Sequence, residues 1–240
     1  MQSINTFIFD LDGTLLPMPS QELFLESYFK ALAMKIIPHG IDVQKLTKAV
    51  WTGTYAMIGN DGSMTNEQRF WNTFSEILGE EIRSLEPVFD DFYQNEFNLA
   101  KSTTSANPLA KECIRILKEK GYTLVLATNP IFPRVATQAR ISWAGLSAED
   151  FMHITTYENA AFCKPNPDYY TEILNIIQKK SSDCIMVGND VAEDMCVSVL
   201  GMDTYLLKDC IINKEETDIS GYKQGGFEDL LEFIRELPDL

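Results

Sequence analysis

Histidine is scarce in this sequence and paired cysteines are absent, which removes several classes of metal protein from consideration. The chain has 240 residues, of which 2 are histidines, and His39 and His153 are not spaced as a pair of metal ligands. Its 5 cysteines form no CxxC pair. Protein zinc sites depend on such nitrogen and sulfur ligands, so zinc is disfavoured. An odd number of cysteines favours a reducing compartment, and we expect a cytoplasmic protein.

Basic residues are also few compared with acidic ones. The chain has 20 Lys and Arg residues against 35 Asp and Glu residues, a formal net charge of −15. Such a surface repels nucleic-acid phosphates and anionic lipid headgroups, so we expect neither a nucleic-acid partner nor a membrane partner. A small anionic substrate can still bind where local cations and backbone N–H groups outweigh the repulsive field.

Several sequence signals are missing as well. Residues 1–13 have no basic segment and their apolar run is broken at Asp10, so we expect neither a signal peptide nor a membrane span there. No GxSxG, Walker-type loop or GxGxxG occurs. Hydrolases with a serine elbow, P-loop enzymes and dinucleotide-binding enzymes are therefore not indicated.

What the sequence does contain is an alternation of strand-like and helix-like segments. Apolar runs predict strands at 6–11, 122–127, 153–156, 183–187 and 204–207. Helical spacing covers about 108–120, 132–144, 168–180, 192–200 and 227–237. This order predicts an α/β fold with a doubly wound, mostly parallel, Rossmann-like sheet. Ligands of such folds bind beyond the carboxyl ends of the strands.

The segment 17–103 interrupts this alternation. It is far too long for a βα loop, and helical spacing recurs at 23–37, 46–58, 66–78 and 87–99. We predict a helical cap at 17–103, inserted into a core formed by 1–16 and 104–240. Because it follows the first acidic cluster directly, it would stand over the site as a lid. Its aromatic side chains, among them Trp51, Phe70 and Trp71, are expected to form helical core rather than a substrate-binding box.

Two polar clusters follow the first two predicted strands of the core. In Asp10-Leu11-Asp12-Gly13-Thr14, both carboxylates can face one pocket, since the glycine lets the backbone turn sharply. Thr128-Asn129 offers a hydroxyl and an amide that can hydrogen-bond phosphoryl oxygens. Taken singly, each cluster can also be read as an ordinary turn or cap.

Two further clusters fall on the same edge of the predicted sheet. Lys164 precedes Pro165-Asn166-Pro167 and could be a fixed cation or a solvated surface lysine. The segment 188–194, GNDVAED, places acids after another strand, where one aspartate could simply cap a helix. Capping does not explain why the carboxylates and Lys164 converge on one edge. Asp10, Asp12 and Asp190 would repel one another without a cation, and oxygen ligands with room for water favour Mg²⁺.

Together, FDLDGT at 9–14, ATN at 127–129, KPNP at 164–167 and GND…D at 188–194 resemble the haloacid dehalogenase superfamily, and the insertion resembles the helical cap of its first cap class. The resemblance implies that Asp10 is the nucleophile and forms an aspartyl-phosphate. It implies that Asp12 is the general acid and base. The dehalogenases of the superfamily lack this second aspartate, so its presence indicates a phosphatase.

The resemblance also implies roles for the other motifs. Thr128, with Asn129 beside it, would bind the phosphoryl oxygens, and Lys164 would stabilise charge on the nucleophile and the phosphate. Mg²⁺ would be held by the Asp10 carboxylate, the Asp12 backbone carbonyl and an acid of the last motif. Many members have Gly-Asp where this chain has Gly188-Asn189, so the last ligand is either moved to Asp190 or partly lost. We favour Asp190 and leave the roles of Asn189 and Asp194 open.

These observations predict a magnesium-dependent phosphoric monoester hydrolase that acts on a small phosphorylated metabolite. Two alternatives remain. A phosphomutase would use the same residues but return the phosphoryl group to a sugar. A non-catalytic binding protein could share the fold, since fold alone does not guarantee chemistry. The sequence selects neither the phosphomonoester nor the oligomeric state, and it does not identify the specificity residues of the cap.

Overall fold

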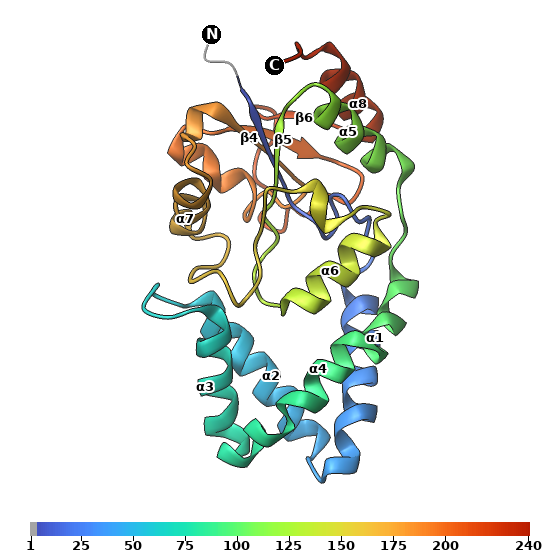
Figure 1. Ribbon diagram of the computed structural model, residues 1–240, viewed down its shortest axis with the longest axis vertical. Helices are drawn as coiled ribbons and strands as arrows, with labels where there is room; N and C mark the ends of the chain where they lie inside the picture. The colour runs from blue at the N-terminus through green and yellow to red at the C-terminus, as the bar shows by residue number, and fades with distance from the viewer. Residues whose placement is uncertain (1–3) are drawn as a thin grey trace.

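The computed structural model describes residues 4–240 and shows an α/β core with a helical insertion at one end (Figure 1). Within these residues, six parallel strands form one sheet in the order β3-β2-β1-β4-β5-β6. The strands are β1 (Thr6–Phe9), β2 (Thr123–Leu126), β3 (His153–Ile154), β4 (Cys184–Gly188), β5 (Asp203–Leu207) and β6 (Lys223–Gly225). This confirms the predicted doubly wound α/β fold.

The central strand β1 is buried on both faces. Its side chains alternate, so Phe7 and Phe9 pack with helices α5 (Pro108–Glu119) and α8 (Phe227–Glu236), whereas Ile8 packs with α7 (Pro167–Ile177). Figure 1 shows α7 on one side of the sheet and α5 with α8 on the other. A strand covered on both faces reads as a continuous apolar run, which is why residues 6–9 gave a clear signal.

The insertion between β1 and β2 is helical, as predicted. Its helices are α1 (Gln21–Ile36), α2 (Val43–Ile58), α3 (Asn66–Leu78) and α4 (Glu86–Gln94), with short 3-10 segments η1 (Ile37–His39), η2 (Glu80–Leu85) and η3 (Glu96–Thr103). In Figure 1 they form a group at the end of the molecule opposite the two termini. Helix α6 (Arg134–Trp143) lies between this group and the sheet. The carboxyl ends of the strands therefore face the insertion.

Side-chain caps mark where three of the inserted helices, α1 to α3, begin. Ser20 accepts a hydrogen bond from the Leu23 backbone N–H at the start of α1, and Asp42 accepts one from Lys45 at the start of α2. Helix α3 begins with a reciprocal capping box between Thr65 and Gln68. Each cap satisfies a backbone donor that the first helical turn leaves free.

The structure corrects three details of the sequence prediction. The helix expected at 87–99 breaks at Asn95 (φ −116°, ψ −82°), where α4 gives way to η3. The helix expected at 192–200 is only a 3-10 helix, η6 (Met195–Leu200), because acidic side chains bind the backbone of the preceding turn. Strand β6 was missed, since its three residues show no alternation of apolar and polar side chains. In the described part of the chain, every helix is too short or too polar to cross a bilayer.

Candidate active site

The loop after β1 places the first acidic cluster at the edge of the sheet. The Asp10 backbone N–H still donates to Val187 O at 2.9 Å, which continues the β1–β4 pairing before the chain turns. Gly13 has a φ of +84°, and a Cβ atom at this position would collide with Asn189 Nδ2. Glycine is therefore required twice, for the left-handed backbone and for the close approach of the β4 loop.

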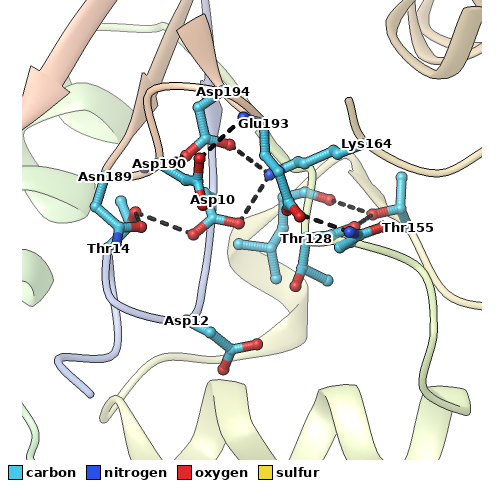
Figure 2. A network of polar contacts seen from close by, with 12 residues as sticks. Asp10, Asp12, Thr14, Thr128, Thr155, Lys164, Asn189, Asp190, Glu193 and Asp194 are labelled. Atoms are coloured by element: carbon cyan, nitrogen blue, oxygen red, sulfur yellow. Dashed lines mark hydrogen bonds and ion pairs between the residues drawn. The ribbon is translucent and has the colours of Figure 1, made fainter. Parts of the chain in front are cut away.

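Asp10 is held between a hydroxyl and an ammonium group. Its Oδ2 lies 3.0 Å from Thr14 Oγ1, and its Oδ1 accepts a hydrogen bond from Lys164 Nζ at 2.8 Å. The side chain is 10% exposed. The Thr14 hydroxyl also lies 2.9 Å from Asn189 Oδ1, so its single proton is shared between the two acceptors. These contacts fix the carboxylate and leave a small part of it accessible from the site (Figure 2).

Lys164 joins Asp10 to the acidic motif after β4. The lysine side chain is 1% exposed, and its Nζ also contacts Asp194 Oδ1 at 2.6 Å. Burial alone would lower the pKa of Lys164, but the charges of Asp10 and Asp194 outweigh it and hold that pKa well above its ordinary value. Burial raises the pKa of Asp194, and Lys164 opposes that shift. Lys164 therefore stays cationic between two buried acids, as the sequence hypothesis of a fixed cation requires.

Asp12 lies apart from this cluster, farther along the same loop (Figure 2). Its Oδ2 forms an ion pair with Arg140 Nη1. Its Oδ1 is buried and has no hydrogen-bond partner within residues 4–240. Burial raises the pKa of Asp12, while the nearby Arg140 charge opposes the rise. A carboxyl group in this environment holds a proton more readily than one in water, which suits an acid that donates a proton.

Arg140 on α6 is a residue that the sequence analysis missed. It is 1% exposed, its guanidinium lies 4.6 Å from the centre of the Phe132 ring, and its Nη2 donates to Thr137 Oγ1 at 3.3 Å. A signal was available, because the buried face of α6 includes Ala136 and Ile141 and the same face carries Arg140. A charged residue on an apolar helix stripe is rarely buried without a partner.

The β2 loop contributes Thr128 and Asn129. Thr128 is buried, and its backbone carbonyl accepts hydrogen bonds from Thr155 Oγ1 at 2.7 Å and Tyr169 Oη at 2.8 Å. Its hydroxyl makes no hydrogen bond to another residue in the range 4–240 and is free to bind a ligand. Asn129 Nδ2 instead donates to Glu193 Oε2 at 3.1 Å. The Thr128 hydroxyl is thus better placed than the Asn129 amide for an incoming oxygen.

The β4 loop separates Asn189 from Asp190. Asn189 is 1% exposed and fully engaged, since its Nδ2 donates to Cys210 O at 2.6 Å and its Oδ1 meets the Thr14 hydroxyl. The half-buried Asp190 accepts two backbone hydrogen bonds, from Ala192 at 2.8 Å and Glu193 at 3.0 Å, through Oδ1 alone. Asp190 Oδ2 has no partner in the described chain. Asp190 therefore retains an oxygen for a ligand, while Asn189 braces the loop.

The donor set is compatible with magnesium. Among residues 4–240, no three His, Cys, Asp or Glu side chains converge closely enough to enclose a metal ion by themselves. Mg²⁺ does not need such a cage, because it usually binds one or two carboxylates and keeps several waters. The carboxylates of Asp10 and Asp190 are hard oxygen donors of this kind. The residues present therefore fit the ion.

A cavity of about 350 Å³ brings most of the predicted residues together. Its polar lining consists of Asp10, Asp12, Thr128, Asn129, Arg140, Asn189, Asp190, Glu193, Asp194 and Lys214, together with Gln21 and Thr54 of the insertion. Lys164 lies behind Asp10 and touches the cavity only through its partners. Burial raises the pKa of Glu193 to about 7. The cavity is acidic and open to a metal ion and a small phosphate ester.

The family model of the haloacid dehalogenase-like hydrolases matches residues 4–195 of the sequence. The chain belongs to this family. The match includes the Asp10 and Lys164 motifs and ends just after Asp194, so it covers the buried cluster described above.

The individual proteins that this haloacid dehalogenase-like hydrolase resembles share only a low sequence identity with it. It is 27% identical over 193 residues to a phosphoglycolate phosphatase of Vibrio parahaemolyticus, a match that covers 78% of this chain and 76% of the relative. A phosphoglycolate phosphatase of Vibrio vulnificus matches to the same extent. Among solved structures, a HAD phosphatase from Thermococcus onnurineus has a TM-score of 0.58 at 17% identity, covering 98% of this chain and 100% of that one.

A second solved structure, the L-2-haloacid dehalogenase of Xanthobacter autotrophicus, has a TM-score of 0.57 at 14% identity and covers 98% of this chain and 99% of that one. Identities this low show a shared fold. The comparisons confirm the predicted family, the fold class and the predicted class of enzyme, a phosphoric monoester hydrolase. The roles of individual site residues stay predictions.

Proposed function

We propose that this haloacid dehalogenase-like hydrolase is a magnesium-dependent phosphatase that hydrolyses a small phosphomonoester through an aspartyl-phosphate on Asp10. The observation that carries the proposal is the position of Asp10. Its carboxylate lies at a cavity and is fixed by Lys164 and Thr14 on the side away from it. A fixed carboxylate with an accessible edge is the arrangement that in-line attack on phosphorus needs.

In the first step, an Asp10 oxygen forms a bond to phosphorus while the bond from phosphorus to the leaving oxygen breaks. Asp12 donates its proton to that leaving oxygen, and the alcohol departs. In the second step, Asp12 takes a proton from a water molecule, whose oxygen attacks phosphorus and releases inorganic phosphate from Asp10. Lys164 stabilises charge on the Asp10 carboxylate, and the Thr128 hydroxyl binds the phosphoryl oxygens, on which negative charge is spread during both steps.

Magnesium would be held by the carboxylates of Asp10 and Asp190 and by the Asp12 backbone carbonyl. When bound, the ion supplies positive charge that lets the dianionic phosphate approach several carboxylates. Asp190 supports this proposal through its free Oδ2, whereas both polar atoms of the Asn189 side chain are already bonded.

The inserted helices would form the cap, with boundaries at 16/17 and 103/104. The two linkers lie together, because the Ser105 backbone N–H donates to Pro17 O at 3.2 Å. Gln21 and Thr54 from the insertion line the same cavity as Asp10. A hinge at the paired linkers would let the cap open for substrate and close to exclude water.

The test is phosphate release by the purified chain from a panel of phosphomonoesters, with and without Mg²⁺. Because the curated relatives are phosphoglycolate phosphatases, phosphoglycolate and p-nitrophenyl phosphate come first. We expect activity that a chelator abolishes, and an acid-quenched reaction should yield a peptide phosphorylated on Asp10. Asp10→Asn should lose several orders of magnitude in kcat, whereas Asp239→Asn, an exposed surface control, should not. Metal-independent phosphate release, or full activity in Asp10→Asn, would refute the proposal.

A further inference from the structure

A second, smaller cavity lies within the insertion, and we call it the aromatic chamber. Its volume is about 80 Å³. Its walls come from helices α1 to α4, from the segment 131–133 before α6 and from Tyr157. The lining residues are mostly aromatic or aliphatic: Leu25, Tyr28, Phe29, Leu32, Val50, Trp51, Thr54, Phe70, Trp71, Phe74, Phe89, Asp90, Tyr93, Ile131, Phe132, Pro133 and Tyr157. Trp71 and Phe74 belong to the hydrophobic core, as expected, and also line this cavity.

The aromatic chamber adjoins the cavity of about 350 Å³ that contains Asp10, which we call the catalytic cavity. Five residues line both spaces: Leu25, Trp51, Thr54, Ile131 and Phe132. The ring of Phe132 is packed against Arg140, which in turn holds Asp12, the group proposed to protonate the leaving oxygen. The chamber thus lies on the side of the catalytic cavity where the leaving alcohol of a phosphomonoester would extend.

The chamber wall has little capacity to bind a charged group. It contains no Lys or Arg. The hydroxyls of Tyr28 and Tyr93 hydrogen-bond to each other at 3.1 Å, and burial raises the pKa of Tyr28 to about 12, so the pair stays neutral. Asp90 is an acid and is exposed at the margin. An anionic group entering this space would lose its hydration without gaining a partner.

The catalytic cavity also lacks a buried cation for a second anionic group. Lys164 is occupied by Asp10 and Asp194, and Arg140 is occupied by Asp12. Of the basic residues that line this cavity in the described chain, only Lys214 has no ion pair, and it is exposed. The phosphate of a substrate can bind beside Asp10, but no cation of the cavity is available to bind a carboxylate on the same molecule equally well.

We infer that the substrate is a phosphomonoester whose leaving alcohol carries a short, uncharged apolar group, and that the aromatic chamber binds this group. The inference rests on the proposed phosphatase function. Size limits the group, because a cavity of about 150 Å³ accepts benzene, and the chamber is smaller. A linear or branched alkyl group of a few carbons fits this space.

The test measures kcat/KM for phosphate release along the series methyl, ethyl, propyl and butyl phosphate. Burying one methylene is worth about a fourfold gain, so butyl phosphate should exceed methyl phosphate by roughly 60-fold over three methylenes. Propyl phosphate should also exceed phosphoglycolate, which is of similar length but ends in a carboxylate. A flat series, or a preference for phosphoglycolate over propyl phosphate, would refute the inference while leaving the phosphatase function intact.

A variant places the effect in the chamber. Val50 on α2 lines the chamber and not the catalytic cavity, so Val50→Phe should fill it and reduce the butyl-to-methyl ratio towards one. Val50→Leu, a smaller change, should give an intermediate ratio and serves if the larger side chain impairs folding. Val43→Phe is the matched control, because Val43 begins the same helix, is 38% exposed and lines neither cavity.

The outcomes separate the two proposals. An unchanged ratio in Val50→Phe, or an equal loss in Val43→Phe, would show that the chamber does not bind the leaving group. Absence of phosphate release from every compound, p-nitrophenyl phosphate included, would refute the phosphatase function and the inference with it. Binding of non-hydrolysable butyl phosphonate, measured by calorimetry, should weaken in Val50→Phe and gives a second readout that is independent of turnover.

Discussion

Replacing Lys164 by methionine tests the buried charge cluster directly. Methionine has a similar length but no charge, so Lys164→Met leaves the carboxylates of Asp10 and Asp194 side by side in a site where Lys164 and Asp194 are each 1% exposed. Removing one partner of a buried ion pair typically costs about 3–5 kcal/mol of unfolding free energy. The loss should be near the upper end of this range, because Lys164 contacts two acids at 2.8 and 2.6 Å.

The cost should depend on pH in a defined direction. Burial already raises the pKa of Asp194, and Lys164 now opposes that rise. Without the lysine, folded Asp194 binds a proton at a pH where the unfolded chain has lost it. Stability then falls as pH increases above the unfolded value of 3.8, because the folded state binds more protons. The variant should be most destabilised near pH 8 and least destabilised near pH 5.

Urea denaturation in the presence of a chelator measures these differences. The double variant Lys164→Met/Asp194→Asn removes both charges of the inner pair and should recover a substantial part of the lost stability, a coupling of about 1–3 kcal/mol. Refolding of each variant from urea gives the required check on reversibility. A loss below about 1 kcal/mol at both pH values, with no recovery in the double variant, would show that Lys164 does not hold the acids together.

Three further changes test the proposed metal loop and the half-buried His153. Asn189→Ala should cost about 1–3 kcal/mol in urea denaturation, because it strands buried hydrogen-bond partners, yet change the Mg²⁺ requirement little. Asp190→Ala should instead raise the Mg²⁺ concentration for half-maximal activity by more than the roughly 100-fold that loss of an outer contact can cause; the opposite ranking would mean that Asn189 is the ligand. Burial lowers the pKa of His153, whose Nε2 has no hydrogen-bond partner in the described chain. As pH falls below 6.5, the unfolded state therefore binds a proton at His153 before the folded state does, and stability decreases. His153→Gln should therefore lose less stability than the parent between pH 7.5 and 5.5, and equal slopes of melting temperature against pH would contradict this.

Much of the fold could be predicted because the relevant signals are local. The strand at 6–9, TFIF, is buried at every position and apolar at all but Thr6. The successive helical segments after residue 20 together exceed the length of any βα loop. The signal for the turn after β4 is also local, but it was outweighed by the apparent helical spacing. Side chains of Asp190 and Asp194 compete there for backbone N–H groups, so helical spacing at 192–200 overstated the helix.

The candidate site was predicted as a set of residues but not as a set of contacts. The sequence indicated that Asp10 and Lys164 meet at one edge of the sheet, since both follow strands or loops at the carboxyl end. It did not indicate that Asn189 would be buried against Gly13 and bonded to Cys210, because that contact depends on how two distant loops pack. The metal assignment to Asp190 gains support from the contacts of Asn189, whose Nδ2 donates to Cys210 O and whose Oδ1 lies 2.9 Å from the Thr14 hydroxyl.

The two aspartates of the first motif are close in sequence, but each contacts a different basic residue. Asp10 contacts Lys164, 154 residues later, and Asp12 contacts Arg140, 128 residues later. Lys164 is placed to stabilise negative charge on Asp10, the proposed nucleophile, while burial raises the pKa of Asp12, the proposed proton donor. The two buried basic side chains are thus already paired, Arg140 with Asp12 and Lys164 with both Asp10 and Asp194. With both of these side chains engaged, residues 4–240 offer no further buried cation for a substrate that carries a carboxylate as well as a phosphate.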